Sequence, residues 1–237
     1  MELYRFLQQQ GFGSRKECRK LVEYGLVELD GVLAQDYRQS VDVAAVGEMV
    51  VDGEIWQPVT LPLYLMLHKP PAYETSHKPQ HHRSVFSLLP WQFVQLDIAA
   101  VGRLDVDTTG LLLLTTDGAC IHALSSPRRH VPKRYEVQLK YPVEPRLVRH
   151  LEEGVFLKDD KERVAADAVE VLAESSLALT ISQGKYHQVK RMIAAAGNRV
   201  MELHRTAVGG VELGELEEGQ WRLLSPDELS CLGLEAK

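Results

Sequence analysis

The chain has 237 residues, 45% hydrophobic and 25% charged, a balance typical of a protein with a hydrophobic core and unlike that of a disordered chain. No apolar run approaches the ~20 residues that cross a bilayer, and "MELYRFLQQQ" lacks the basic start and apolar stretch of a signal peptide, so we expect a cytoplasmic protein. The three cysteines are far apart and form neither a disulfide framework nor a zinc motif.

The net charge of −6 at first argues against a nucleic-acid partner, because basic domains are the usual sign of one. The charge is segregated, however. "SRKECRK" (Ser14–Lys20) holds four basic residues and one acid, and "PRRHVPKRY" (Pro127–Tyr135) holds four basic residues and no acid. Acidic residues collect in "VELGELEEGQ" and "SPDELS" near the end. Because binding depends on where charges lie, the acidic total does not exclude a polyanionic partner.

Residues 1–58 read as one small domain. Apolar residues recur at helical spacing from Leu3 to Leu7, and Ser14 is a candidate N-cap for a second helix through Tyr24. Asp-Gly pairs at 30–31 and 52–53 each join two short β-rich runs, which predicts two hairpins. The second helix would carry a basic face, although a solvated helix face is the plainer alternative. Its basic residues are Arg15, Lys16, Arg19 and Lys20.

We expect a linker at "QPVTLP" (57–62) and a second domain over 62–237. Strand patterns alternate irregularly with helical patterns, which favours an α+β fold with a mainly antiparallel sheet. The histidines of "ETSHKPQHHRS" have no cysteine or glutamate at ligand spacing, so we expect no metal. The predicted strands are "LYLMLHKP" and residues 98–101, 111–115, 134–139, 178–182 and 200–203, and the predicted helices are 118–124, 144–153 and 186–196.

Three charged residues interrupt an apolar segment in "AAVGRLDVDTTGLLLLTTDG" (99–118), namely Arg103, Asp105 and Asp107. Burying charges is costly, and active sites are where that cost is usually found. We expect "GRLDVDTTG" to be an exposed loop between two buried strands, with a turn at "DTTG" and Gly110 at positive φ. Two carboxylates this close also fit a glycosidase-like pair, but Asp107 as a cap of the turn is the simpler interpretation.

Several motifs, in order, resemble those of pseudouridine synthases of the RsuA type. "GRLDVDTTGLLLLTTDG" resembles the family's catalytic signature, "KRYEV" its Lys-x-Tyr segment, and "ISQGKYHQVKRMIAAAGNRVMELHR" its third motif and the strand beyond. "SRKECRKLVEYGLVELDG" resembles the S4-like RNA-binding domain that precedes the catalytic domain in this group. "GKYHQVKRM" and "ELHR" most resemble members that modify 16S ribosomal RNA at uridine 516.

The resemblance implies roles for the site residues. Asp105 would be the essential carboxylate, as nucleophile or as base, and would be ionised at neutral pH. Lys190 would pair with it, with Arg191 as the fallback partner, although most members place arginine at this position. Tyr135 would stack on the target uracil and Leu203 would close the other face of the base, while both are also ordinary core residues. Isomerisation of uridine needs no cofactor.

The resemblance also implies contacts with the RNA. Arg103 would be inserted into the base stack in place of the extruded uridine. Lys133, Arg128, Arg129 and the basic helix would contact phosphates, so binding should weaken steeply with salt. We expect a monomer that acts on 16S ribosomal RNA or on an assembly intermediate of the small subunit. A 23S ribosomal RNA site and a catalytically inactive RNA-binding relative are the alternatives.

Overall fold

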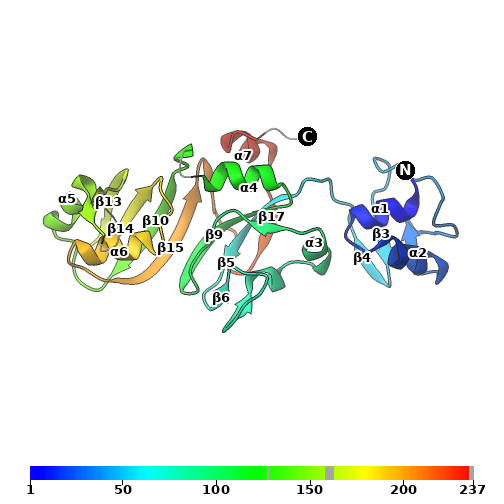
Figure 1. Ribbon diagram of the computed structural model, residues 1–237, viewed down its shortest axis with the longest axis horizontal. Helices are drawn as coiled ribbons and strands as arrows, with labels where there is room; N and C mark the ends of the chain where they lie inside the picture. Colours follow the sequence, from blue (N-terminus) through cyan, green and yellow to red (C-terminus); the bar gives the residue numbers. More distant parts are fainter. Residues whose placement is uncertain (127–128, 158–162, 235–237) are drawn as a thin grey trace. The chain divides into compact units, whose positions relative to one another are not determined.

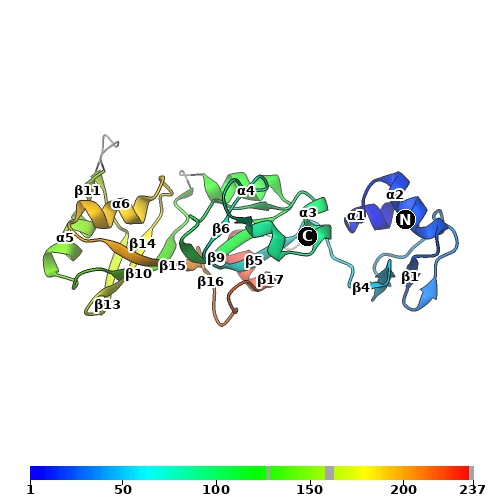
Figure 2. The ribbon, with the colours of Figure 1, turned by 90° about the horizontal axis from the view of Figure 1, so that it is seen from below.

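The computed structural model describes residues 1–126, 129–157 and 163–234. The chain forms two compact units (Figures 1 and 2). The first contains Met1–Leu63 and Leu89–Ile98, and the second contains Tyr64–Leu88 and Ala99–Lys237. Residues 89–98, which fall within the predicted second domain of 62–237, pack with the N-terminal unit instead. Among the described residues, no helix is both long and apolar enough to cross a membrane.

The first unit has the predicted helices and hairpins. Ser14 caps its helix through a capping box, in which its hydroxyl accepts from the Glu17 backbone and the Glu17 carboxylate accepts from the Ser14 backbone. Asp30 and Asp52 both have positive φ and are each followed by a glycine at positive φ, as tight hairpin turns require. The elements are α1 (Leu3–Gln9), α2 (Arg15–Glu23), β1 (Val27–Leu29), β2 (Val32–Leu33), β3 (Met49–Val51), β4 (Glu54–Trp56) and α3 (Trp91–Gln95), with sheet order β2-β1-β3-β4.

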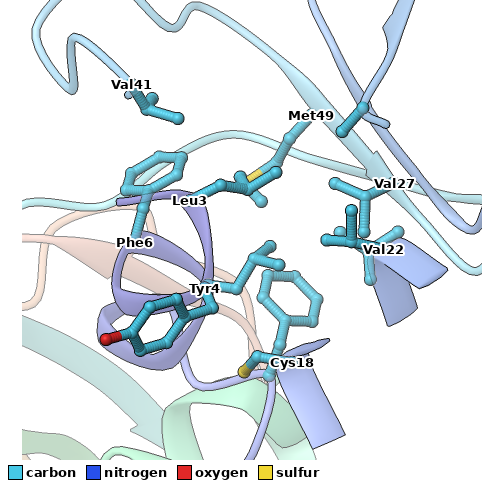
Figure 3. Close-up of a cluster of buried hydrophobic side chains, with 12 residues drawn as sticks. Leu3, Tyr4, Phe6, Cys18, Val22, Val27, Val41 and Met49 are labelled. Carbon is cyan, nitrogen blue, oxygen red and sulfur yellow. The ribbon is translucent and has the colours of Figure 1, made fainter. Parts of the chain in front are cut away.

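Figure 3 shows the core of this unit. Leu3 and Phe6 from α1 meet Val22 from α2 and Val27 and Met49 from the sheet, and each of the five is at most 3% exposed. Full burial of such side chains contributes about 1.5–3 kcal/mol each. Two helices and a small sheet therefore share one hydrophobic core.

Aromatic contacts attach residues 89–98 to this core. Phe12 packs edge-on against Trp91, with ring centroids 5.8 Å apart, and Trp56 packs in the same way against Phe93 at 5.6 Å. The linker is anchored as well, because the Gln10 side chain bonds both the backbone N–H and the carbonyl of Val59. The segment was missed because a single helical turn has too few residues to show a period.

The second unit contains one large sheet of order β13-β14-β10-β15-β9-β5-β17, with β16 paired to β15 and β8 to β9. Within it only β15 and β9 run parallel, which confirms the prediction of a mainly antiparallel α+β fold. Helix α6 packs against β15 and β11, and α5 against β13, which Figure 2 shows as helices on one side of that part of the sheet. The elements are β5 (Tyr64–Lys69), β6 (Tyr73–Glu74), β7 (Arg83–Ser84), the 3₁₀ helix η1 (Val85–Leu88), β8 (Ala99–Ala100), β9 (Thr108–Thr115), α4 (Gly118–Ser125), β10 (Lys133–Leu139), α5 (Pro145–Glu153), β11 (Val155–Phe156), β12 (Arg163–Val164), β13 (Ala168–Ala173), β14 (Ser176–Ile181), α6 (Gln188–Ala195), β15 (Val200–Val208), β16 (Val211–Glu212), β17 (Trp221–Leu223) and α7 (Pro226–Cys231).

The predicted strands and helices of this unit are present, but the strand predicted at 200–203 continues to Val208, and the predicted loop is shorter than expected. Residues 108–110, interpreted as a turn, already belong to β9, where Thr108 pairs with Leu203 and the Thr109 hydroxyl bonds His204 Nδ1 at 2.8 Å. Gly110 has the predicted positive φ, of 103°. It also lets β9 approach β15, because a Cβ here would overlap the backbone carbonyl of Arg205.

We predict that Gly110→Ala destabilises the protein by at least about 3 kcal/mol, since the substitution meets both an unfavourable φ and a backbone overlap. Gly118→Ala is the control. Gly118 lies in the first turn of α4, and a Cβ there meets nothing within 4 Å. The control should be neutral or slightly stabilising. Urea denaturation measures both variants, and equal free energies of unfolding would contradict the prediction.

Candidate active site

A cleft of about 160 Å³ lies over one face of the large sheet, beside the loop that precedes β9. Residues that pair directly across neighbouring strands point to the same face. In the register of these strands, Leu203 lies opposite Thr108 and Tyr135 lies opposite Arg205. The side chains of each pair therefore lie on the same face of the sheet. The loop and the start of α6 form the rest of the lining. The residues that the strands of the sheet contribute to the cleft are Thr108, Lys133, Tyr135, Ile181, Leu203, Arg205 and Val208.

An ion-pair cluster lies where the loop meets α6. Lys190 Nζ donates to Asp105 Oδ2 at 3.2 Å and to Asp107 Oδ1 at 2.6 Å. The other oxygen of Asp105, Oδ1, lies 3.3 Å from His187 Nε2. The Asp105 side chain is 31% exposed and lines the cleft, whereas Asp107 is 72% exposed. The expected pair of Asp105 and Lys190 is present, and Asp107 bonds the same lysine rather than acting only as a cap.

The pKa shifts in this cluster have opposing causes. Burial by itself lowers the pKa of Lys190, but the hydrogen bonds to Asp107 and Asp105 outweigh it, so the pKa is raised. Burial by itself raises the pKa of Asp107, but the hydrogen bond from Lys190 and its positive charge, together with a backbone hydrogen bond and the nearby His187, bring the pKa below its ordinary value. Both groups are therefore charged at neutral pH, and a fixed ammonium faces the Asp105 carboxylate. A carboxylate held in this way can act as a nucleophile or as a base.

A second lysine, which the sequence analysis did not single out, holds the loop from behind. Lys69 ends β5 and is 0% exposed. Its ammonium donates to the carbonyls of Pro70 at 2.9 Å, Val106 at 3.3 Å and Thr108 at 2.9 Å. Burial lowers the pKa of Lys69 to about 8, although the charges of Asp107 and Asp105 oppose the shift. The only sequence feature that could have pointed to Lys69 was its place in "HKP", at the end of the predicted strand.

His187 was also missed. It precedes α6 in a left-handed conformation with φ 46°, which a non-glycine residue rarely adopts and which often marks a functional site. Its ring stacks on Tyr186 at 3.8 Å, and the Tyr186 carbonyl accepts from Arg191 Nη1 at 3.3 Å. Lys190, and not the fallback partner Arg191, contacts Asp105 in this structure.

Tyr135 and Leu203 are nearly buried, 8% and 6% exposed, and both line the cleft. Arg205 anchors Tyr135, since its Nη1 lies 3.5 Å from the tyrosine hydroxyl while its Nε donates to the carbonyl of Leu111 at 2.7 Å. Arg205 is 3% exposed and joins three strands. The strand pattern around "ELHR" gave no sign of this role.

The predicted RNA-contacting residues lie in several places. Arg103 is exposed and Lys133 half-buried, and both line the cleft. Arg129 is exposed on the segment that leads to β10, and Arg128 lies outside the described residues. In the first unit the basic residues of α2 line a shallow surface depression, which contains Arg15, Lys16, Arg19, Lys20 and Glu23.

The His-rich loop is organised around Glu74, whose carboxylate accepts from the backbone N–H groups of Gln80, His81 and His82. His77 stacks on Phe86 at 3.6 Å. Among the residues that the structure describes, no group of three His, Cys, Asp or Glu side chains is placed to hold a metal ion.

The chain matches known proteins in sequence and in fold. The family model described as RNA pseudouridylate synthase matches residues 63–195. The "Ribosomal small subunit pseudouridine synthase A" of Pasteurella multocida is 37% identical over 231 residues, which cover 97% of this chain and 98% of the relative. The Bacillus subtilis "Uncharacterized RNA pseudouridine synthase YtzG" is 39% identical, with 98% of both chains covered. A crystal structure of a pseudouridylate synthase superposes with a TM-score of 0.69 at 34% identity, covering 98% of this chain and 99% of the other.

Lys69 should make stability depend on pH. Its pKa is about 8 in the folded protein and 10.5 ordinarily, so between these values the unfolded chain binds more protons and the folded state gains stability as pH rises. We predict that the wild type gains stability relative to Lys69→Met from pH 8 to pH 10, by at most about 1.4 kcal/mol per pH unit. Urea denaturation at several pH values measures this difference.

The control is Lys78→Met, which changes an exposed lysine of the same unit. Its free energy of unfolding should follow that of the wild type at every pH. A Lys69→Met curve that also runs parallel to the wild type would contradict the assignment.

Proposed function

The chain belongs to the RNA pseudouridylate synthase family, and we propose on that premise that it converts one uridine of 16S ribosomal RNA to pseudouridine. The observation that carries the proposal is the Asp105 carboxylate, which lines a cleft with Tyr135 and is held by Lys190. The names of several relatives, which include small-subunit pseudouridine synthases, favour 16S over 23S ribosomal RNA. Uridine 516 is the target that we propose.

The reaction breaks the bond from uracil N1 to the ribose C1′ and forms a bond from C5 to the same carbon. C5 loses its proton and N1 gains one, so the product is an isomer of uridine. Asp105 either attacks C1′ or removes a ribose proton, and in both cases the base departs as an anion. Lys190 donates a hydrogen bond to one oxygen of the carboxylate, and His187 contacts the other. Tyr135 stacks on the uracil and Leu203 covers its other face, so that the detached base turns without leaving the cleft.

The uridine must leave the base stack to reach this cleft, at a cost of a few kcal/mol. We assign Arg103, exposed at the mouth of the cleft, to the space that the extruded base leaves. Lys133, Arg128, Arg129 and Arg191 contact phosphates in this scheme. Counterion release then makes affinity fall steeply with salt.

The first unit serves in this proposal as an S4-like RNA-binding domain, with the α2 side chains Arg15, Lys16, Arg19 and Lys20 on the phosphate backbone. Arg15 and Arg19 lie over the rings of Tyr4 and Tyr37 at 4.9 and 4.2 Å. These contacts hold the basic face of α2 in place.

The enzyme works as a monomer in the cytoplasm, on free 16S RNA or on an assembly intermediate of the small subunit, and it needs no cofactor.

Pseudouridine mapping of ribosomal RNA from cells that lack the gene tests the proposal. One modification should disappear from 16S RNA and return when the wild-type gene is supplied. Loss of a 23S modification would move the substrate to the large subunit. Unchanged maps of both RNAs would overturn the proposal.

We predict that Asp105→Asn lowers the rate of pseudouridine formation by at least about 1,000-fold, as loss of a nucleophile or base does. The affinity for RNA should change little, because phosphate contacts dominate it. Single-turnover rates and filter binding measure the two quantities. The matched control is Asp107→Asn, in the same loop but 72% exposed, which should cost far less. Equal losses in the two variants would contradict the role of Asp105.

A further inference from the structure

Two buried polar atoms of the cleft have no hydrogen-bond partner. They are Thr108 Oγ1 and Arg205 Nη2, and no other buried side-chain nitrogen or oxygen in the described part of the chain shares this condition. Thr108 is 2% exposed and Arg205 3% exposed, and both line the cleft. Since nearly all buried polar groups in proteins are bonded, each exception needs an explanation.

Strand register explains why both atoms belong to one site. Thr108 lies opposite Leu203, and Arg205 lies opposite Gly110, which contributes no side chain to the same face. The guanidinium is fixed through its other two nitrogens, by Leu111 at 2.7 Å and Tyr135 at 3.5 Å. A rigid hydrogen-bond donor on Arg205 and the Thr108 hydroxyl therefore belong to the same cleft as Tyr135, the residue proposed to stack on the base.

We propose that Thr108 and Arg205 are the side chains that hydrogen-bond the edge of the target uracil, an assignment that rests on the proposed function. Uracil presents carbonyl oxygens and an N3–H group. Arg205 Nη2 donates to O4, and the Thr108 hydroxyl accepts from N3–H. Cytosine carries an amino group in place of O4, so two donors would face each other at Arg205. The Thr108 hydroxyl would also have to turn and donate to N3, which carries no hydrogen in cytosine. The mismatch at Arg205 therefore disfavours cytosine.

The same contact favours the chemical step. When the N1–C1′ bond breaks, its electron pair goes to uracil N1, and the negative charge spreads onto the carbonyl oxygens. A guanidinium donor binds that anion more strongly than it binds the neutral base. Because Arg205 is already oriented by its two other contacts, no reorganisation is needed as the charge develops.

Thr108→Val is the decisive variant because the hydroxyl has no partner in the free protein. Valine has a similar shape and removes an unbonded polar atom, so the midpoint of thermal unfolding should rise by roughly 2–4 °C. The single-turnover rate on 16S RNA should fall about tenfold, because one hydrogen bond to the base is lost. Thr108→Ser keeps the hydroxyl and should recover most of that rate.

The control is Thr115→Val, the same substitution on the same strand. Thr115 is 1% exposed, and its hydroxyl accepts from the Asp117 backbone at 3.0 Å. This variant should lower the unfolding midpoint and leave the rate unchanged, the opposite of Thr108→Val. A Thr108→Val enzyme that keeps the wild-type rate, or that is destabilised as Thr115→Val is, would overturn the assignment.

Arg205→Lys tests the second contact. Lysine keeps a positive charge but cannot bond Leu111, Tyr135 and the base together, so the rate should fall by at least about 100-fold. The affinity for RNA that carries uridine at the target should change little. The ratio of this affinity to the affinity for RNA that carries cytidine there should fall. A wild-type rate or an unchanged preference in this variant would overturn the role of Arg205.

If the wild-type enzyme itself forms no pseudouridine in 16S or 23S RNA, the proposed function fails, and the assignment fails with it.

Discussion

The contact on which the site depends is the Lys190 ammonium between the carboxylates of Asp105 and Asp107. The loop that carries both aspartates lies between the β8 and β9 regions of the sheet, where a charge without a partner would be costly. One cation from the start of α6 compensates both. It thereby sets the position of the loop relative to the cleft, and it joins two segments that lie more than 80 residues apart in the sequence.

A second set of hydrogen bonds holds the backbone of the same loop. Lys69 bonds the carbonyls of Val106 and Thr108, Ala72 donates to Val106 at 2.8 Å, and the Thr75 hydroxyl donates to Leu104 at 2.9 Å. These contacts all come from the last residue of β5 and the segment that follows it, so the course of the chain there defines where Asp105 lies. Active-site loops need such support, because small displacements of a reacting group are costly in rate.

The sequence predicted those site residues that stand out in a local sequence pattern. It missed the residues whose role depends on which strands pair in the sheet. Asp105 stood out because charges interrupt an apolar run, and resemblance then pointed to Lys190; the structure brings the two together. Lys69, Thr108 and Arg205 lie in strands that look like ordinary core. The importance of Thr108 and Arg205 follows from the parallel pairing of β9 with β15, and that of Lys69 from the antiparallel pairing of β5 with β9. No periodicity within these strands reveals their register. The pairing of β9 with β15 extends β9 back to Thr108 and shortens the predicted loop.

A lysine at position 190, where the resemblance implies arginine in most members, fits this particular loop. An arginine fork matches the two oxygens of one carboxylate, whereas an ammonium is a compact charge with three donors that point in different directions. Here the two acceptors belong to different residues, Asp105 Oδ2 at 3.2 Å and Asp107 Oδ1 at 2.6 Å, and Asp105 Oδ1 is left to His187. A fork that took both oxygens of Asp105 would displace His187 and leave Asp107 without its cation. Lys190 therefore bonds one oxygen of each aspartate while His187 contacts the remaining oxygen of Asp105, so that both oxygens of the carboxylate that faces the cleft have a partner.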